Sequence, residues 1–466
     1  MMGESTTKDT ADTTPTYDCV VIGAGYSGLA AARLLRDAGK KVLVLEARDR
    51  VGGRAKTIPL DNGDYWDVGA SFLGHKQDLM YGLAKEFDVP LFKPPSQGKI
   101  VLAYRGKARS YGGLIPPMKP WEVLDTGLFV RRFEKLCETV NMEEPWQTPN
   151  AEELDRVTVH EWLKKQAWTQ ATIDLGNMAF EATIGQNTSC ISMLHAMFFF
   201  KGVVSLTSGL SCENGAQQHF IQGGGQAIAE KLRETLGDGG IRFEEPVCGI
   251  TYTESLATIR TSKGTYRSQR IISAIPPPHI LKIDFEPRLP IEKTTLLQHM
   301  PMGAYMKVYA TYKTPFWRER GLTGESTNPT GFLSVTYDAT SQSGCPAKLT
   351  GFIVGTKARE FVSFSKDQKR AVALAGFASA FGPEALDPEE FFFHTMMEEE
   401  WALGCPMATP APGMWTLLGE WVRKPVGAIH WAGTETSTKH YGYMEGAVSA
   451  GQRAAREVLE ELKWKI

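Results

Sequence analysis

The sequence predicts an α/β fold, in which a Rossmann-like nucleotide-binding domain carries a second, mixed-sheet domain. Three observations predict it: a glycine-rich turn near the N-terminus, a return to alternating strands and helices in mid-chain, and a strand, glycine turn and long helix at the end. A length of 466 residues is enough for two domains. The net charge of −2 gives no electrostatic reason to expect a nucleic acid or a membrane surface as partner.

The first glycine-rich turn has the spacing of a dinucleotide-binding fingerprint. An apolar run at 20–22 leads into Gly23, Gly25 and Gly28, and a helix follows. In this pattern the first glycine permits the tight turn, the second lets the backbone approach a pyrophosphate, and the third lets helix and strand pack closely. The new helix also directs free N–H groups at the anion. The expected ligands in this turn are Gly23, Gly25, Ser27 and Gly28.

The segment after the second strand narrows the ligand. The strand at 41–45 delivers Glu46, whose carboxylate can accept hydrogen bonds from a ribose hydroxyl. The run EARDRVGGR follows and resembles the FAD-dependent oxidoreductases, in which the ribose acid precedes a Gly-Gly-Arg segment. Arg54 is expected on the pyrophosphate, because a guanidinium fork suits paired phosphate oxygens. The alternative is a basic, glycine-bearing surface loop. The expected ligands here are Glu46, Arg48, Gly53 and Arg54.

The pattern of elements divides the chain into two predicted domains. The nucleotide-binding domain is expected in three pieces, 15–92, 222–296 and 401–466, because strands and helices alternate again in each of them. Residues 93–221 and 297–400 are expected to form the second domain. Residues 1–14 are rich in Thr and Asp and predict a disordered tail. An aromatic-rich helix at 193–204 is expected to be buried, either in the core or under a pocket.

Cysteine usage and hydropathy bear on the compartment. Seven cysteines without a CxxC pair argue against a disulfide framework and a zinc site, and favour a reducing compartment. No stretch approaches the roughly 20 apolar residues that a membrane span needs. The N-terminus lacks the apolar core of a signal peptide. We therefore expect a soluble, cytoplasmic protein.

The end of the chain carries the strongest family resemblance. A strand leads into a glycine turn with Gly433 and Glu435, and the last helix begins near Tyr443. The N-terminus of that helix can stabilise negative charge on a ligand. The run AGTETSTKHYGYMEGAVSAGQRAAREVL resembles the C-terminal FAD-binding segment of the flavin monoamine oxidases. Further matching stretches lie at 67–74, 214–217, 223–232, 272–277, 306–317 and 351–359.

This resemblance implies a fold, a cofactor and a reaction. The implied fold is an FAD-binding domain of the glutathione-reductase/p-hydroxybenzoate-hydroxylase type, with a mixed-sheet substrate domain above the flavin. Members of the family oxidise amines to imines, which water hydrolyses to aldehyde and ammonia, and they pass the electrons to O2, which yields hydrogen peroxide. We therefore predict FAD-dependent oxidation of primary amines by a chain that can form a homodimer. The alternatives are a polyamine oxidase and a non-catalytic FAD-binding scaffold.

The resemblance assigns roles to three catalytic candidates. Lys307 matches a lysine that holds a water beside the flavin and assists the reaction with oxygen. The strand pattern around it fits a solvent-facing lysine equally well. Tyr443 matches one wall of an aromatic cage that guides the amine. Gln217 matches a pocket glutamine that orients the substrate, and a plain turn residue is the alternative.

The chain departs from the family at the second wall of that cage. Where the family's covalent-flavin members have a cysteine followed by a tyrosine, this chain has Cys405 followed by Pro406. A proline cannot replace an aromatic ring, although Tyr441, His440 or another aromatic residue could fill part of the gap. We expect a wider pocket that admits bulky or long-chain amines. Cys405 is the candidate for a thioether to the flavin, with a non-covalent flavin as the alternative. The other cofactor ligands implied by the resemblance are Gly69, Ala70, Val247, Gly433, Glu435, Gly442, Tyr443 and Met444.

Overall fold

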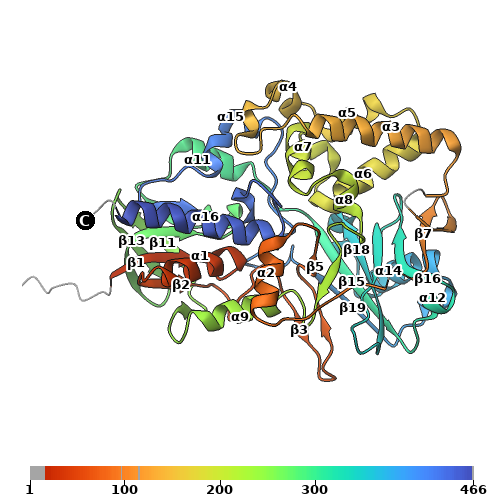
Figure 1. Cartoon of the computed structure of the whole chain (residues 1–466), viewed down its shortest axis with the longest axis horizontal. Coiled ribbons are helices and arrows are strands. Elements are labelled where there is room, and N and C mark those ends of the chain that lie inside the picture. Colours follow the sequence, from red (N-terminus) through yellow and green to blue (C-terminus); the bar gives the residue numbers. More distant parts are fainter. Residues whose placement is uncertain (1–15, 96, 114–115, 464–466) are drawn as a thin grey trace, which may run out of the picture.

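Two large sheets organise the fold, with helices packed around them (Figure 1). The computed structural model describes residues 16–95, 97–113 and 116–463. The predicted tail at 1–14 therefore lies outside the described residues. The two sheets confirm the predicted α/β class with a second, mixed sheet.

The first sheet has eight strands in the order β10-β2-β1-β13-β12-β11-β14, and β20 pairs with the end of β13. Its centre is parallel, because β1 pairs in parallel with both β2 and β13, while β12 is antiparallel to its neighbours. The buried apolar residues of the first run form the middle of this sheet. The strands are β1 (Thr16–Ile22), β2 (Val42–Leu45), β10 (Ile241–Arg242), β11 (Val247–Tyr252), β12 (Ala257–Thr261), β13 (Thr265–Ser273), β14 (Asp284–Glu286) and β20 (Ile429–Trp431).

Helices α1 (Tyr26–Asp37) and α16 (Met444–Lys463) lie side by side on this sheet, so the first and the last helix of the chain meet (Figure 1). Their close approach depends on glycine. A Cβ on Gly451 would lie 2.0 Å from the carbonyl oxygen of Ser27. The chain therefore brings the first glycine turn and the last helix to one place, as a nucleotide-binding domain in several pieces requires.

The second sheet has seven strands in the order β19-β15-β18-β17-β16-β7-β8. All its neighbouring pairs are antiparallel except β16 with β7, which makes the sheet mixed. Strand β18 is buried along its whole length, and α14 (Lys366–Phe381) contributes to the same core. The strands are β7 (Lys99–Tyr104), β8 (Lys107–Tyr111), β15 (Tyr305–Tyr312), β16 (Leu322–Thr327), β17 (Val335–Asp338), β18 (Ala347–Val354) and β19 (Glu390–Thr395).

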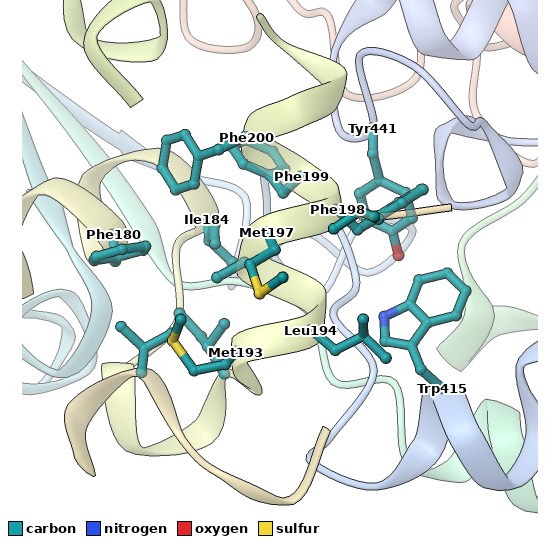
Figure 2. Packing of buried hydrophobic residues seen from close by; sticks show 14 of the residues in the cluster. Phe180, Ile184, Met193, Leu194, Met197, Phe198, Phe199, Phe200, Trp415 and Tyr441 are labelled. Atoms are coloured by element: carbon teal, nitrogen blue, oxygen red, sulfur yellow. The ribbon is translucent and has the colours of Figure 1, made fainter. Parts of the chain in front are cut away.

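A helical layer forms a core of its own beside the second sheet. Its centre is α7 (Met193–Gly202), the predicted aromatic-rich helix, in which Met193 to Phe200 are all buried. Figure 2 shows its side chains packed against Phe180, Trp415 and Tyr441. The surrounding helices are α3 (Pro120–Cys137), α4 (Ala151–Arg156), α5 (Val159–Gln166), α6 (Gln170–Ile184), α8 (Leu206–Leu210) and α15 (Met414–Leu418).

The segment at 57–72 differs from the strand-like run that its sequence indicates. It contains three two-residue strands, β3 (Ile58–Pro59), β4 (Tyr65–Trp66) and β5 (Phe72–Leu73). A turn at 60–64 separates the first two, with hydrogen bonds between the backbones of Leu60 and Asp64. Beyond β4 the backbone turns toward Lys307, whose ammonium binds the Asp67 carbonyl, so a continuous strand does not form.

A small three-stranded sheet, β5-β9-β6, joins the predicted domains. It pairs β9 (His219–Ile221) with β5 and with β6 (Leu91–Phe92). Strand β9 comes from the segment assigned to the second domain, but both of its partners come from the segment assigned to the first. The division of the chain into these two domains therefore stays a prediction. Within the described ranges, no helix is both long and apolar enough to cross a bilayer.

Candidate active site

A cavity of about 490 Å³ is lined by residues of both sheets. The ends of β1, β2 and β11 contribute from the first sheet, and β15, β17 and β18 contribute from the second. Of the residues predicted to bind cofactor or substrate, only Gly28 and Glu435 are absent from its wall among the described residues. No described residue of α7 lines it either, so the aromatic-rich helix is core and not pocket wall.

The first glycine turn forms one end of the cavity. Gly23 has φ +99, and a Cβ there would lie 2.9 Å from the Ile275 side chain. A Cβ on Gly28 would lie 1.9 Å from the Gly23 carbonyl oxygen, which explains why the third position admits only glycine. Gly25 pairs with Gly52 in a parallel bridge and sits beside Gly53. The two glycine segments thus form one backbone surface without side chains.

Glu46 is buried at this end of the cavity, at the end of β2. Its carboxylate accepts hydrogen bonds from the backbone N–H of Ala24 at 2.6 Å and of Arg48 at 2.9 Å. These bonds fix the acid beside the glycine turn. The backbone N–H of Glu245 donates to the Glu46 carbonyl, and Glu245 and Val247 continue the same wall.

Arg54 and Glu435 form a buried two-pronged ion pair. The guanidinium nitrogens lie 2.6 and 3.0 Å from the carboxylate oxygens, and the same guanidinium donates to the Pro406 carbonyl at 2.8 Å. Glu435 also accepts from the backbone N–H of Ala408. Burial lowers the pKa of Arg54, but the charge and the hydrogen bonds of Glu435, together with smaller contributions from Cys405 and Tyr441, outweigh it and the pKa is raised. Arg54 lines the cavity. The Glu435 carboxylate does not line it, and its hydrogen bonds come from Arg54 and the backbone of Ala408.

The closing turn is joined to the first helix by a side chain. Ser27 accepts a hydrogen bond from the backbone N–H of Gly433 at 2.8 Å. Gly433 and Gly442 have φ of +90 and +87, and both line the cavity. A Cβ on Gly442 would lie 1.9 Å from the Met407 sulfur. The turn therefore needs glycine to bring the start of α16, with Met444, to the cavity wall.

Lys307 is buried on β15, so the solvent-facing interpretation of its strand is wrong. Its ammonium donates to the carbonyls of Asp67 at 2.8 Å and Gly69 at 2.5 Å, and to the Ser71 hydroxyl. Burial lowers the pKa of Lys307 to about 8, although the charges of Asp67 and Cys405 oppose the shift. The segment 67–71, with Gly69 and Ala70 on the cavity wall, is thus attached to the second sheet by one lysine.

Tyr443 and Gln217 both lie on the cavity wall. The Tyr443 ring stacks on Phe199 of α7, with 6.1 Å between ring centroids and 26° between planes. The amide nitrogen of Gln217 donates to the Gly209 carbonyl at 3.3 Å. Its amide oxygen is buried and has no hydrogen-bond partner among the described residues. Gln217 therefore offers a free acceptor at the wall.

Cys405 and Pro406 also line the cavity. Burial raises the pKa of the Cys405 thiol to about 12, against the charges of Lys307 and Arg54. A Cβ on Gly185 would lie 2.8 Å from the Pro406 ring and 3.2 Å from the Tyr305 ring. The rings of Pro406 and Tyr305 therefore both lie close to Gly185.

An aromatic wall that the sequence did not indicate extends from Tyr305. Neighbouring ring centroids in this wall are 6.1 Å apart for Tyr305 and Phe352, 5.8 Å for Phe352 and Tyr337, and 5.3 Å for Tyr337 and Phe72. All four line the cavity. Of the residues expected to fill the gap at Pro406, Tyr441 and His440 do not line the cavity, and another aromatic residue, Tyr305, lies beside Pro406. Tyr441 is buried with its hydroxyl on the Ala408 carbonyl, and His440 interacts with the Lys76 carbonyl.

Two further polar groups on the wall were also missed. Both ring nitrogens of His279 are buried without a hydrogen-bond partner among the described residues, and burial lowers its pKa to about 4. His394 lies at the end of β19. Neither belongs to a motif with a recognisable spacing. The only signal for the aromatic wall is that Tyr305 and Lys307 are two apart on one strand and so share a face.

The residues present fit FAD. The bare glycine surface admits a diphosphate, Glu46 can accept from a ribose, and Arg48 carries a buried guanidinium nitrogen without a hydrogen-bond partner among the described residues. The cavity then continues past Lys307 to the aromatic wall, where a second, apolar ligand can lie.

Comparisons with known proteins agree with this geometry. The family model for flavin-containing amine oxidoreductases matches residues 26–459. A Mycobacterium tuberculosis protein named as the flavin-containing monoamine oxidase AofH is 40% identical, over 95% of this chain and 96% of its own length. Amine oxidase B of Mus musculus is 35% identical, over 96% of this chain and 86% of its own length.

Solved structures give the same result. Putrescine oxidase bound to putrescine superposes with a TM-score of 0.93 at 30% identity, over 96% of this chain and 100% of that one. Cyclohexylamine oxidase from Brevibacterium oxydans gives a TM-score of 0.92 at 31% identity, with the same coverage. With the cavity described above, these likenesses show that the chain belongs to the flavin-containing amine oxidoreductases, which are FAD enzymes that oxidise amines.

Proposed function

We propose that this chain oxidises primary amines that carry a bulky or long apolar group, and that its products are aldehyde, ammonia and hydrogen peroxide. The observation that carries the proposal is the aromatic wall of Tyr305, Tyr337, Phe352 and Phe72, which shares one cavity with Lys307 and Tyr443. Pro406 in place of a ring leaves part of the wall to Tyr305. A wall of this kind supports binding of an alkyl or aryl group.

The wall also favours the reactive form of the substrate. An amine is a cation at neutral pH, and only its neutral form has the lone pair that oxidation requires. Apolar surroundings disfavour the ammonium and lower the pKa of the amine. In our proposal Tyr443 and Tyr305 guide the amine, and the free oxygen of Gln217 orients its nitrogen. FAD, when bound, would supply the redox chemistry: the Cα hydrogen would leave the amine with two electrons, the nitrogen would lose one proton, and the electrons would pass on to O2.

We assign Lys307 to the oxygen step. Its ammonium is buried on the cavity wall and is fixed by the carbonyls of Asp67 and Gly69. A fixed cation in a water-poor site stabilises negative charge that develops on oxygen, and it does so without reorganisation. Its three N–H donors are used by Asp67, Gly69 and Ser71, so a water at the wall would share or replace one of these bonds. Removal of the cation should therefore slow the step with O2 more than the step with the amine.

The charges on the wall argue against two related activities. Glu46 and Glu245 are the acidic residues on the described wall, and both lie at the nucleotide end. The aromatic end has neither an acid for a second ammonium nor an arginine for a substrate carboxylate among its described residues. A polyamine oxidase is therefore the second candidate, and an amino-acid oxidase is disfavoured. The homodimer and the cytoplasmic location stay predictions, which sedimentation and localisation of a tagged chain would test.

A panel of amines tests the proposed function. Peroxide release should be fastest with hexylamine or benzylamine and much slower with spermidine or an amino acid, because the aromatic end lacks a second charged partner. Initial rates at equal substrate concentration give the comparison. Faster oxidation of spermidine would favour a polyamine oxidase, and release with none of the four would contradict amine oxidation.

Replacement of Lys307 tests its assignment. Lys307→Met should slow the reaction with O2 by about 100-fold or more and leave reduction by amine within a few-fold, as measured by stopped-flow in two separate half-reactions. In the unchanged protein the oxygen step should slow as pH rises through about 8, because the ammonium is lost there. The variant should lose this pH dependence.

Lys348→Met is the matched control for Lys307. Lys348 is buried on the adjacent strand β18 and bonds Asp64 at 2.6 Å, but it does not line the cavity. It should keep a normal oxygen step. An unchanged oxygen step in Lys307→Met would overturn the assignment.

Variants of Tyr305 test the second wall. Tyr305→Ala should lower kcat/KM for benzylamine about tenfold, since an aromatic contact contributes about 0.5–1.5 kcal/mol beyond its burial. Tyr305→Phe keeps the ring and should stay within about twofold of the unchanged protein. Equal losses in both variants would assign the effect to the hydroxyl, and no loss in either would exclude Tyr305 from the wall.

Acid precipitation tests a thioether between Cys405 and the flavin. The sulfur would bond to the 8α-methyl carbon, with loss of one hydrogen from each and transfer of two electrons to O2. The position of the thiol on the cavity wall supports this proposal. The precipitated protein should be yellow, and Cys405→Ala should give a colourless pellet and a yellow supernatant. A colourless pellet from the unchanged protein would contradict the bond.

A further inference from the structure

Glu399 stands at the centre of a group of three cationic side chains, Lys56, Arg48 and Arg50, and one histidine, His394. It follows β19, in the run Glu398-Glu399-Glu400, and its side chain is 17% exposed. One carboxylate oxygen lies 2.6 Å from the Lys56 ammonium and 3.0 Å from Nε2 of His394. The other lies 3.7 Å from guanidinium nitrogens of Arg48 and Arg50. A single carboxylate thus joins the segment 48–56, which contains Gly52 and Gly53, to the second sheet.

The charge of this carboxylate is strongly favoured. Burial raises the pKa of Glu399, but hydrogen bonds from His394 and Lys56 and the charge of Lys56 lower it to about 2. Glu399 is therefore ionised at every pH at which the protein would be used. Its neighbours Glu398 and Glu400 are exposed, so only the middle acid of the run points into the protein.

Two members of the group face the cavity or shape its wall. Arg48 lines the cavity, and its Nη2 is buried without a hydrogen-bond partner among the described residues. Arg50 donates to the carbonyls of Val51 and Gly53, so it shapes the loop that carries Gly52, Gly53 and Arg54 to the wall. Nη2 of Arg48 is also the atom that lies 3.7 Å from the Glu399 carboxylate, beyond hydrogen-bond distance, and its Nη1 lies 3.9 Å from Glu46. Glu399 therefore attracts both guanidinium groups without taking up the Nη2 donors of Arg48, which stay available to an anion in the cavity.

FAD carries a diphosphate, and a buried guanidinium with free donors is the side chain that suits it. We propose that Glu399 is a positioning residue for the cofactor: it fixes Arg48 and the Gly52–Arg54 loop in the arrangement that binds the FAD diphosphate. The proposal depends on FAD as the cofactor and not on the identity of the amine.

The direction in which anion affinity changes when Glu399 loses its charge distinguishes this proposal from a purely electrostatic effect. Loss of a negative charge near a phosphate site should strengthen anion binding if only the charge mattered. Loss of the residue that positions Arg48 should weaken it. Glu399→Gln keeps the shape of the side chain and removes the charge, so the two explanations predict opposite changes.

The experiment uses Cys405→Ala as background, so that FAD can be removed and added back. Dissociation constants of FAD, ADP and adenosine are measured by titration calorimetry of the apoprotein. Glu399→Gln should weaken FAD and ADP about tenfold, within the range of coupling between contacting residues. Adenosine lacks phosphate and should bind within about twofold, which also shows that the variant is folded.

Three further variants sharpen the result. Glu400→Gln removes the same charge from the next, exposed residue and should leave all three constants unchanged. Glu399→Asp should restore part of the ADP affinity. In an Arg48→Met background Glu399→Gln should weaken ADP much less than in the Arg48 protein, because the positioned group is gone. Tighter or unchanged binding of FAD and ADP in Glu399→Gln, or an equal loss for adenosine, would overturn the proposal.

Discussion

The buried pair of Arg54 and Glu435 is the interaction on which the cavity depends. It joins three parts of the chain that are far apart in sequence, because Arg54 also binds the Pro406 carbonyl and Glu435 also accepts from Ala408. A buried guanidinium needs a charged partner, and loss of one partner would leave the other uncompensated. The pair therefore fixes the Gly52–Arg54 loop, the Cys405 region and the closing turn relative to one another. Tyr443 and Cys405 reach the cavity only because these segments meet.

Lys307 makes a second connection of the same kind, between the sheets. Its ammonium is bonded by carbonyls of the segment 67–69, so a strand of the second sheet carries the turn that lines the nucleotide end. Glu399 adds a third connection, from β19 to the segment 48–56. All three use charges that are poorly solvated, and each joins segments that are far apart in the sequence. These connections hold the glycine end and the aromatic end of the cavity in place relative to each other.

The sequence located the glycine end of the cavity because its signals are local, and nucleotide binding by these residues stays a prediction. Gly23, Gly25 and Gly28 are set by turn geometry and by close packing, which leave no choice of residue. Glu46 follows at the end of the next strand. The substrate end was predicted less well. Tyr305, Tyr337 and Phe352 come from three strands, and no motif spacing connects them. Glu399 sits in an acidic run that is typical of a solvated surface, and its neighbours are in fact exposed.

The sequence by itself therefore determined the fold class, the glycine turn, the family and part of the cavity wall, since a glycine fingerprint and a family motif act over a few neighbouring positions. Only the tertiary structure decided which side chains face one another. It placed Lys307 inside and not toward solvent, gave the Glu435 carboxylate to Arg54, and brought Tyr305 beside Pro406. The physical reason is that burial, ion pairing and ring packing depend on strands and turns that meet only after the chain has folded.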